Sequence, residues 1–110
     1  MRGARLRILL DNCVPVDFAT HLRGQDVATA VGMQWAHLDD NDLLDAMAGQ
    51  FDVLVTVDKN IPFQQSLNNR PIAIIILHAR SNRVAELARL VAKLRRVLRS
   101  IGPGELREIS

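Results

Sequence analysis

Two patterns of apolar residues alternate along the chain, and they predict strands and helices in turn. Continuous or alternating apolar runs predict five β-strands, at residues 6–10, 26–31, 52–57, 72–77 and 105–109. The run IAIIIL at 72–77 is apolar throughout, which is typical of a strand covered on both faces of a sheet. Apolar residues spaced three or four apart predict helices at 15–24, 41–49 and 82–101, and a polar helical turn or loop is expected at 60–69.

Several helix ends carry residue types that favour them. Pro15 suits the first turn of a helix, where its missing N–H costs no hydrogen bond, and Gly24 suits the end of that helix. Asp40 is expected to be the N-cap of the second helix. The inward face of the second helix is expected to consist of Leu43, Leu44, Met47 and Ala48. The last helix has one apolar stripe and an otherwise basic surface; the stripe is Leu87, Val91, Leu94, Leu98 and Ile101.

Strands and helices alternate along the whole chain, so the sequence predicts an α/β fold. With 110 residues, the chain has the length of a single domain, residues 1–110. The expected architecture is a Rossmann-like, three-layer α/β/α arrangement around a mainly parallel sheet of four to five strands. Right-handed crossovers would place the carboxyl ends of parallel strands at one edge, where open α/β sheets bind their ligands.

The composition favours a cytoplasmic protein with no membrane contact. The first apolar run ends at Asp11 after a few residues, which is too short for a signal-peptide core or a membrane span. Cys13 is the single cysteine, so an intramolecular disulfide is excluded. We expect Cys13 to behave as a small buried apolar residue. The three histidines show no metal-ligand spacing.

The charge is unevenly distributed, although the formal net charge is only +2. Nine of the twelve acids precede residue 60, whereas residues 80–99 contain seven Lys or Arg residues and one acid, Glu86. This separation fits a cation held in one half and a polyanion attracted to the other, and it equally fits a solvated helix face. One tryptophan and three phenylalanines are too few for a base-stacking platform, so a nucleic acid would be held by its phosphates.

Several aspartates are expected at the carboxyl edge of the sheet. Asp11 follows the first strand and Asp58 follows the third. Asp40 and Asp42 begin the helix between the second and third strands, and Asp42 is preferred as a ligand because Asp40 is the expected N-cap. Converging carboxylates repel one another unless a cation lies between them, and an all-oxygen donor set favours Mg²⁺ or Mn²⁺ over zinc. Each aspartate is also compatible with a plain cap or turn role.

Three segments then show a resemblance to a known family. LLDNCVP (9–15), NDLLDAMA (41–48) and FDVLVTVDKNIPFQQSL (51–67) resemble the small stand-alone PIN-like proteins, which are related to VapC-type toxins. PIAIIILHARSNRVAELARL (71–90) and PGE (103–105) extend the resemblance over nearly the whole chain. It implies a PIN-type fold and, as in active relatives, cleavage of RNA that depends on Mg²⁺ or Mn²⁺.

The resemblance also assigns residues by position. Asp11, Asp42 and Asp58 become the catalytic metal carboxylates, with Asp40 as a further metal ligand. Asn60 stands where many relatives have another acid after a T-x-D pattern, which removes one negative charge. The side chains expected to contact RNA are Asn12, Lys59, Asn60 and Arg83. The implied function is a metal-dependent endoribonuclease, the toxin component of a toxin–antitoxin pair, with a small antitoxin protein as partner.

Two alternatives stay open. The first is a PIN-like binding module without catalysis, which Asn60 favours, and whose last helix packs on the sheet or joins a second copy in a homodimer. The second is a phospho-receiver domain, because FDVLVTVDKNIP also resembles the third strand and acceptor aspartate of that family. Against it, Asp11 is followed by Asn12 rather than a second acid, and no lysine follows the fifth predicted strand.

Overall fold

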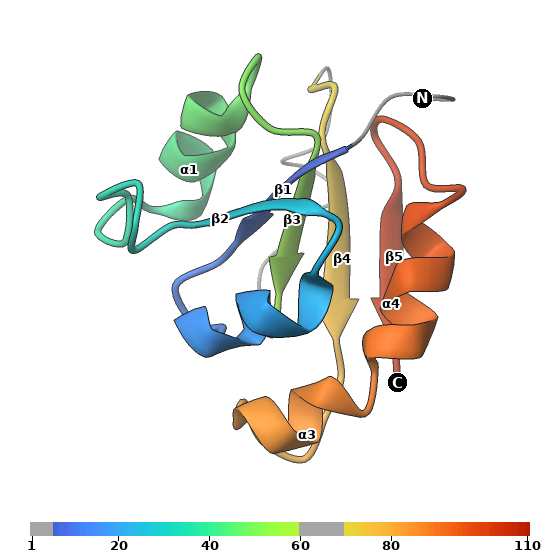
Figure 1. Ribbon diagram of the computed structural model, residues 1–110. Helices are drawn as coiled ribbons and strands as arrows, with labels where there is room; N and C mark the ends of the chain where they lie inside the picture. Colours follow the sequence, from blue (N-terminus) through green and yellow to red (C-terminus); the bar gives the residue numbers. More distant parts are fainter. Residues whose placement is uncertain (1–5, 60–69) are drawn as a thin grey trace.

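The computed structural model describes residues 6–59 and 70–110, which form a five-stranded sheet flanked by helices (Figure 1). The strands lie in the order β2-β1-β3-β4-β5, and every neighbouring pair is parallel. Their bounds are Arg7–Leu10 (β1), Asp26–Thr29 (β2), Val53–Thr56 (β3), Ala73–Leu77 (β4) and Leu106–Ile109 (β5). The predicted α/β architecture is therefore confirmed as a Rossmann-like sheet that is wholly parallel.

Most strands are slightly shorter than predicted. The second strand ends at Thr29 rather than at residue 31, because the Thr29 carbonyl accepts the Met33 N–H at 2.9 Å and the chain turns. The fifth strand is an edge strand that pairs only with β4.

Alternate residues of each central strand enter two separate apolar clusters. In β1, Ile8 and Leu10 lie in the larger cluster and Leu9 in the smaller one. In β3, Leu54 joins Leu9, and Leu43, Leu44 and Met47 of helix α1 cover this face. The opposite face is covered by helices η1, α3 and α4. Side chains that follow Leu9 and Leu54 at even spacing therefore point to the α1 side.

The helices differ from the predicted ones in two respects. Their bounds are Val16–Leu22 (η1), Asp40–Met47 (α1), Val84–Ala88 (α3) and Val91–Leu98 (α4). The first, η1, has the tighter 3-10 form and ends at Leu22, and Gly24 takes a positive φ of 88° beyond it. The predicted helix at 82–101 is two helices, because the Arg89 and Leu90 N–H groups bond three residues back, at 3.4 and 2.9 Å. This break lets α3 pack on η1 while α4 packs along both η1 and β5.

Two crossovers have opposite hands. The connections β1–β2 and β4–β5 run outward across the sheet in opposite directions, yet η1, α3 and α4 all cover the same face. The expectation that all crossovers are right-handed is therefore wrong for one of them. As a result, η1 meets α3 and α4 directly and the larger apolar cluster forms between them. No helix in residues 6–59 and 70–110 is both long and apolar enough to cross a bilayer.

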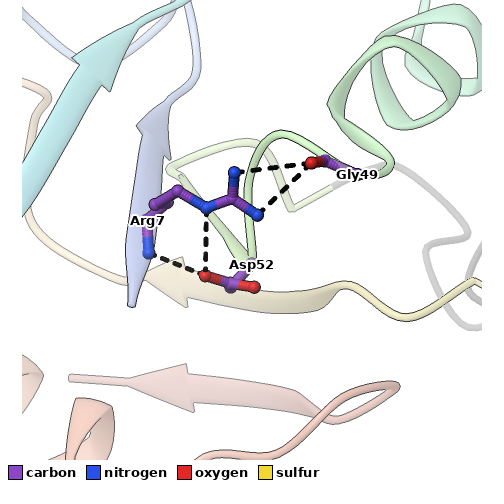
Figure 2. Close-up of polar contacts among 3 residues, drawn as sticks. All are labelled: Arg7, Gly49 and Asp52. Atoms are coloured by element: carbon purple, nitrogen blue, oxygen red, sulfur yellow. Dashed lines mark hydrogen bonds and ion pairs between the residues drawn. The ribbon is translucent and has the colours of Figure 1, made fainter. Parts of the chain in front are cut away.

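A polar cluster joins the starts of the two central strands (Figure 2). The Arg7 backbone N–H donates to Asp52 Oδ2 at 2.8 Å, and the Arg7 Nε lies 3.7 Å from the same oxygen. The Arg7 guanidinium also reaches the Gly49 carbonyl, at 3.4 Å, beyond the end of α1. The cluster thus holds β1 and β3 in register and ties α1 to them at the edge opposite their carboxyl ends.

We expect Asp52→Ala to lower the free energy of unfolding by about 1–2 kcal/mol, because two Arg7 donors lose an ionised acceptor. The matched control is Asp26→Ala at the exposed start of β2, which should stay within about 0.5 kcal/mol of wild type. Urea denaturation measures both. Equal losses in the two variants would show that the Arg7–Asp52 contact does not stabilise the sheet.

Candidate active site

The central strands form a switch point at the carboxyl edge of the sheet. From β1 the chain passes to β2 on one side, whereas from β3 it continues to β4 on the other, so the loops leaving β1 and β3 diverge. Ligands of open α/β sheets bind in the crevice at such a point. Asp11 follows β1 directly and Asp58 comes two residues after β3. Both predicted carboxylates are thus placed at the edge that the fold makes available for a ligand.

Asp11 is a buried acid with a fixed carboxylate. Only 9% of its surface is exposed. Its Oδ2 accepts the Thr56 hydroxyl at 2.7 Å, and its Oδ1 accepts the Asn12 backbone N–H at 2.8 Å. These donors compensate for the lost hydration of the charge. The Asp11 backbone N–H meanwhile bonds the Val55 carbonyl at 2.9 Å, so the acid is held at the end of the β1–β3 ladder.

Thr56 connects the two predicted acids, although it was not among the predicted site residues. It is fully buried, and its hydroxyl oxygen accepts the Asp58 backbone N–H at 3.1 Å while its proton goes to Asp11. A single side chain thus joins the Asp11 carboxylate to the segment that carries Asp58. The signal in the sequence is the T-x-D spacing, but within a β-branched run Thr56 looks like any strand residue.

The acid contributed by α1 is Asp40. The predicted N-cap at Asp40 is wrong: Asp39 has the extended backbone of a cap (φ −74°, ψ 175°), and its Oδ1 accepts the Asp42 N–H at 2.9 Å. Asp40 is therefore the first helical residue, partly buried, whereas Asp42 is exposed. Partial burial and the negative charges of Asp11, Asp58 and Asp39 raise the pKa of Asp40. We call Asp11, Asp40 and Asp58 the acidic site.

The predicted RNA-contacting residues have varied surroundings. The Asn12 side-chain amide donates to the Ala36 carbonyl at 2.8 Å and so holds the loop between β2 and α1 beside Asp11. Lys59 and Arg83 are exposed, and Arg83 is the N-cap residue of α3. Asn60 lies outside the described residues. Asn82 supports the site indirectly, since its amide donates to the Cys13 carbonyl at 3.1 Å.

Cys13 lies beside the acidic site; it is partly buried and packs against the larger apolar cluster. Its Sγ is 3.7 Å from Asp11 Oδ2 and 3.4 Å from Thr56 Oγ1. Burial above all, together with the Asp11 charge, raises the pKa of the Cys13 thiol. The thiol therefore stays protonated near neutral pH, which makes it a poor nucleophile and a poor soft ligand.

The donor set of the acidic site fits a hard cation. It consists of carboxylate oxygens, and the neighbouring thiol does not compete as a ligand. Partial burial raises the pKa of Asp40, and the negative charges of Asp11, Asp58 and Asp39 raise it further; a divalent cation would offset that repulsion. Within residues 6–59 and 70–110, however, no three His, Cys, Asp or Glu side chains are already arranged as a metal-binding group.

Thr56→Val should destabilise the protein by about 1–3 kcal/mol, because the buried Asp11 carboxylate and the Asp58 N–H both lose a partner. Thr56→Ser keeps the hydroxyl and loses one buried methyl group, at a cost of about 0.8 kcal/mol. Chemical denaturation at pH 7 separates the two. A serine variant as unstable as the valine variant would mean that the hydroxyl does not hold the site together.

The raised pKa of Asp40 gives a pH-dependent prediction. The folded protein holds this proton more tightly than the unfolded chain, whose value is near 3.8. Ionisation of Asp40 therefore lowers the free energy of unfolding. The loss grows as pH rises from 3.8 through the raised pKa, and it is absent at lower pH. In EDTA at pH 7, Asp40→Asn should melt at a higher temperature than Asp42→Asn, and the difference should disappear near pH 3.

Asp42→Asn is the matched control for this comparison, because both substitutions remove one negative charge from the first turn of α1. Only Asp40→Asn relieves the repulsion with Asp11 and Asp58. Thermal melts recorded by circular dichroism measure the difference. Identical melting temperatures for the two variants across this pH range would contradict the arrangement of charges.

Comparison with protein-family models, with curated proteins and with solved structures finds no match for this chain. The family resemblance of the motifs remains a prediction. The function proposed below accordingly rests on the geometry of Asp11, Thr56, Asp58 and Asp40.

Proposed function

We propose that the chain is a PIN-like, metal-dependent endoribonuclease in which Asp11, Asp40 and Asp58 hold Mg²⁺ or Mn²⁺. One observation carries the proposal: the Thr56 hydroxyl joins the buried Asp11 carboxylate to the Asp58 backbone at the switch point of the sheet. A fixed, buried carboxylate at the ligand-binding edge is what a preorganised metal ligand requires.

The chain's own groups have separable roles in this proposal. Thr56 and the Asn12 N–H orient the Asp11 carboxylate, and each leaves lone pairs on the carboxylate oxygens for a ligand. Asp58 and Asp40 complete the oxygen donors. When bound, the cation supplies activation of water and neutralisation of charge on a phosphodiester. Exposed Lys59 is placed to contact a phosphate next to Asp58.

In this proposal, Asp40 takes the role of catalytic metal ligand that was predicted for Asp42. The two residues lie in the same helical turn, but Asp40 is the partly buried one whose charge interacts with Asp11 and Asp58. Asp42 is exposed, and its backbone N–H serves the Asp39 cap. The proposal therefore makes Asp42 the control position rather than a ligand.

The wider setting follows from the resemblance alone. We propose a cytoplasmic toxin that is neutralised by a small antitoxin protein encoded beside it. A homodimer is a compatible assembly, although α4 buries its apolar side against the chain's own core.

The test is cleavage of a mixed pool of end-labelled single-stranded RNA by the purified full chain, in Mn²⁺, Mg²⁺ or EDTA. We expect cleavage with either metal and none in EDTA. Asp58→Ala and Asp40→Asn should each reduce the rate by at least about 100-fold, whereas Thr56→Val, which alters a group that orients a ligand, should reduce it about 10- to 100-fold. Asp42→Asn should cleave within about threefold of wild type.

Two results would overturn the proposal. If folded wild-type protein fails to cleave RNA with Mn²⁺ and also with Mg²⁺, a PIN-like binding module would be the better description. Cleavage that persists in Asp58→Ala and Asp40→Asn would place the activity elsewhere or in a contaminating nuclease. A thermal shift in Mn²⁺ that occurs in wild type and is absent from Asp58→Ala would locate the metal even where cleavage is slow.

The receiver-like alternative keeps one supporting observation. The strand order 2-1-3-4-5 is also that of flavodoxin-like folds, and Asp58 lies just after the third strand. The chain has only two lysines, Lys59 and Lys93, and neither follows β5. A stable phosphoryl group on Asp58 after incubation with acetyl phosphate and Mg²⁺, detected by mass spectrometry, would favour this alternative.

A further inference from the structure

In Figure 1, α4 lies beside the edge strand β5 on the side of the sheet opposite α1. A groove lined mainly by charged and polar residues lies between these two elements. It has a volume of about 460 Å³ and is lined by Lys93 and Arg96 from α4, Ser100 just beyond that helix, Arg107 and Glu108 from β5, and Ser110. Its two apolar lining residues are Val97 and Ile109. We call this hollow the α4–β5 groove.

The groove keeps a net positive charge. The Lys93 ammonium donates to the main-chain oxygen of Ser110, and neither Lys93 nor exposed Arg96 pairs with an Asp or Glu side chain in the described part of the chain. The Arg107 guanidinium pairs with Glu105 at 3.0 Å. The Glu108 carboxylate pairs with His78 at 2.6 Å rather than with a groove cation. Arg96 is therefore available to an anion from outside, and Lys93 would have to share its charge with Ser110.

A second hollow lies beside the groove, at the end of β4. It has a volume of about 480 Å³ and is lined by His78, Arg80, Glu86 and Arg89 with two apolar neighbours. The His78 backbone N–H donates to the Ile109 carbonyl at 2.8 Å, so this hollow begins where β5 ends, at the carboxyl edge of the sheet. Together the two hollows present five Lys or Arg side chains and two carboxylates.

The lining chemistry favours phosphates over an acidic protein segment. Four of the five cations are arginines, whose planar guanidinium groups match phosphate oxygens two at a time. Protein partners are usually anchored by aromatic or large apolar side chains in a dry pocket, and neither hollow has an aromatic lining residue apart from the His78 ring. Successive cations along a helix and an adjoining strand suit a ligand that carries a regular series of charges.

We propose that the α4–β5 groove and the adjoining hollow bind the phosphate backbone of a single-stranded nucleic acid, with little base preference. This binding does not depend on the acidic site or on cleavage. A chain with no nuclease activity would still hold the strand there.

The test measures binding in EDTA by fluorescence anisotropy, with a labelled single-stranded RNA of mixed sequence and the full chain. Lys93→Glu/Arg96→Glu should weaken binding at 50 mM salt by about tenfold or more, and should reduce the slope of log K against log salt by about 1.4, the value for two lost phosphate contacts on a single strand. Arg23→Glu/Arg99→Glu is the matched control, because both arginines are exposed, neither lines either of these two hollows, and the net charge changes equally. The control should bind within about threefold of wild type.

Several outcomes would overturn the proposal. One is equal weakening in the two double variants, which would reduce the effect to net charge. Another is the absence of measurable binding by folded wild-type protein at 50 mM salt. A third is equally tight binding of a labelled oligo-glutamate peptide of the same charge, which would point to an acidic protein partner. Asp40→Asn/Asp58→Ala should bind RNA at least as tightly as wild type, because it loses two negative charges, so loss of cleavage and loss of binding remain distinguishable.

Discussion

The hydrogen bond from the Thr56 hydroxyl to the Asp11 carboxylate is the constraint on which the candidate site depends. A carboxylate that is nine-tenths buried is costly unless hydrogen-bond donors replace water, and here the Thr56 hydroxyl and the Asn12 N–H do so. The same hydroxyl accepts the Asp58 N–H, so the Thr56 side chain that bonds the carboxylate after β1 also sets the path of the chain after β3. Stability and site geometry therefore depend on one side chain.

This arrangement requires the register of β1 against β3 to be correct to the residue. Leu9 pairs with Leu54, and both side chains face α1. A slip by one residue would turn Leu9 to the wrong face and carry Asp11 away from Thr56. The Arg7–Asp52 contact fixes the opposite end of the same pair, so polar contacts at both ends enclose an apolar middle. The apolar core thus determines which face of the sheet each side chain takes, and the polar contacts at the two ends determine the register of β1 against β3.

The sequence predicts what local pattern controls. The apolar run of β1, the β-branched run of β3 and the unbroken run of β4 located these strands. Leu43, Leu44 and Met47 lie inward as expected, whereas Ala48, the C-cap of α1, is exposed. The pattern could not reveal the break between α3 and α4, because the stripe of buried leucines continues through it and the break arises from packing against η1. Nor could it choose between Asp39 and Asp40 as the cap. That choice depends on the backbone angles at Asp39, and it decides which carboxylate reaches the acidic site.

The separation of charge within the chain also has a physical consequence. Carboxylates that attract a cation repel a phosphodiester, so a polyanion would need a separate region to hold it. The fold provides that separation, because Asp11, Thr56 and α1 belong to one face of the sheet, whereas α3 and α4 cover the other. Arginines close to the acidic site would pair with its carboxylates and lower its demand for a cation. On the opposite face, exposed Arg96 and Lys93 make no contact with an Asp or Glu side chain in the described part of the chain, so their charge can act on an outside anion. The carboxyl ends of the strands, which both faces share, then connect the acidic site to the basic face, and each keeps its charge.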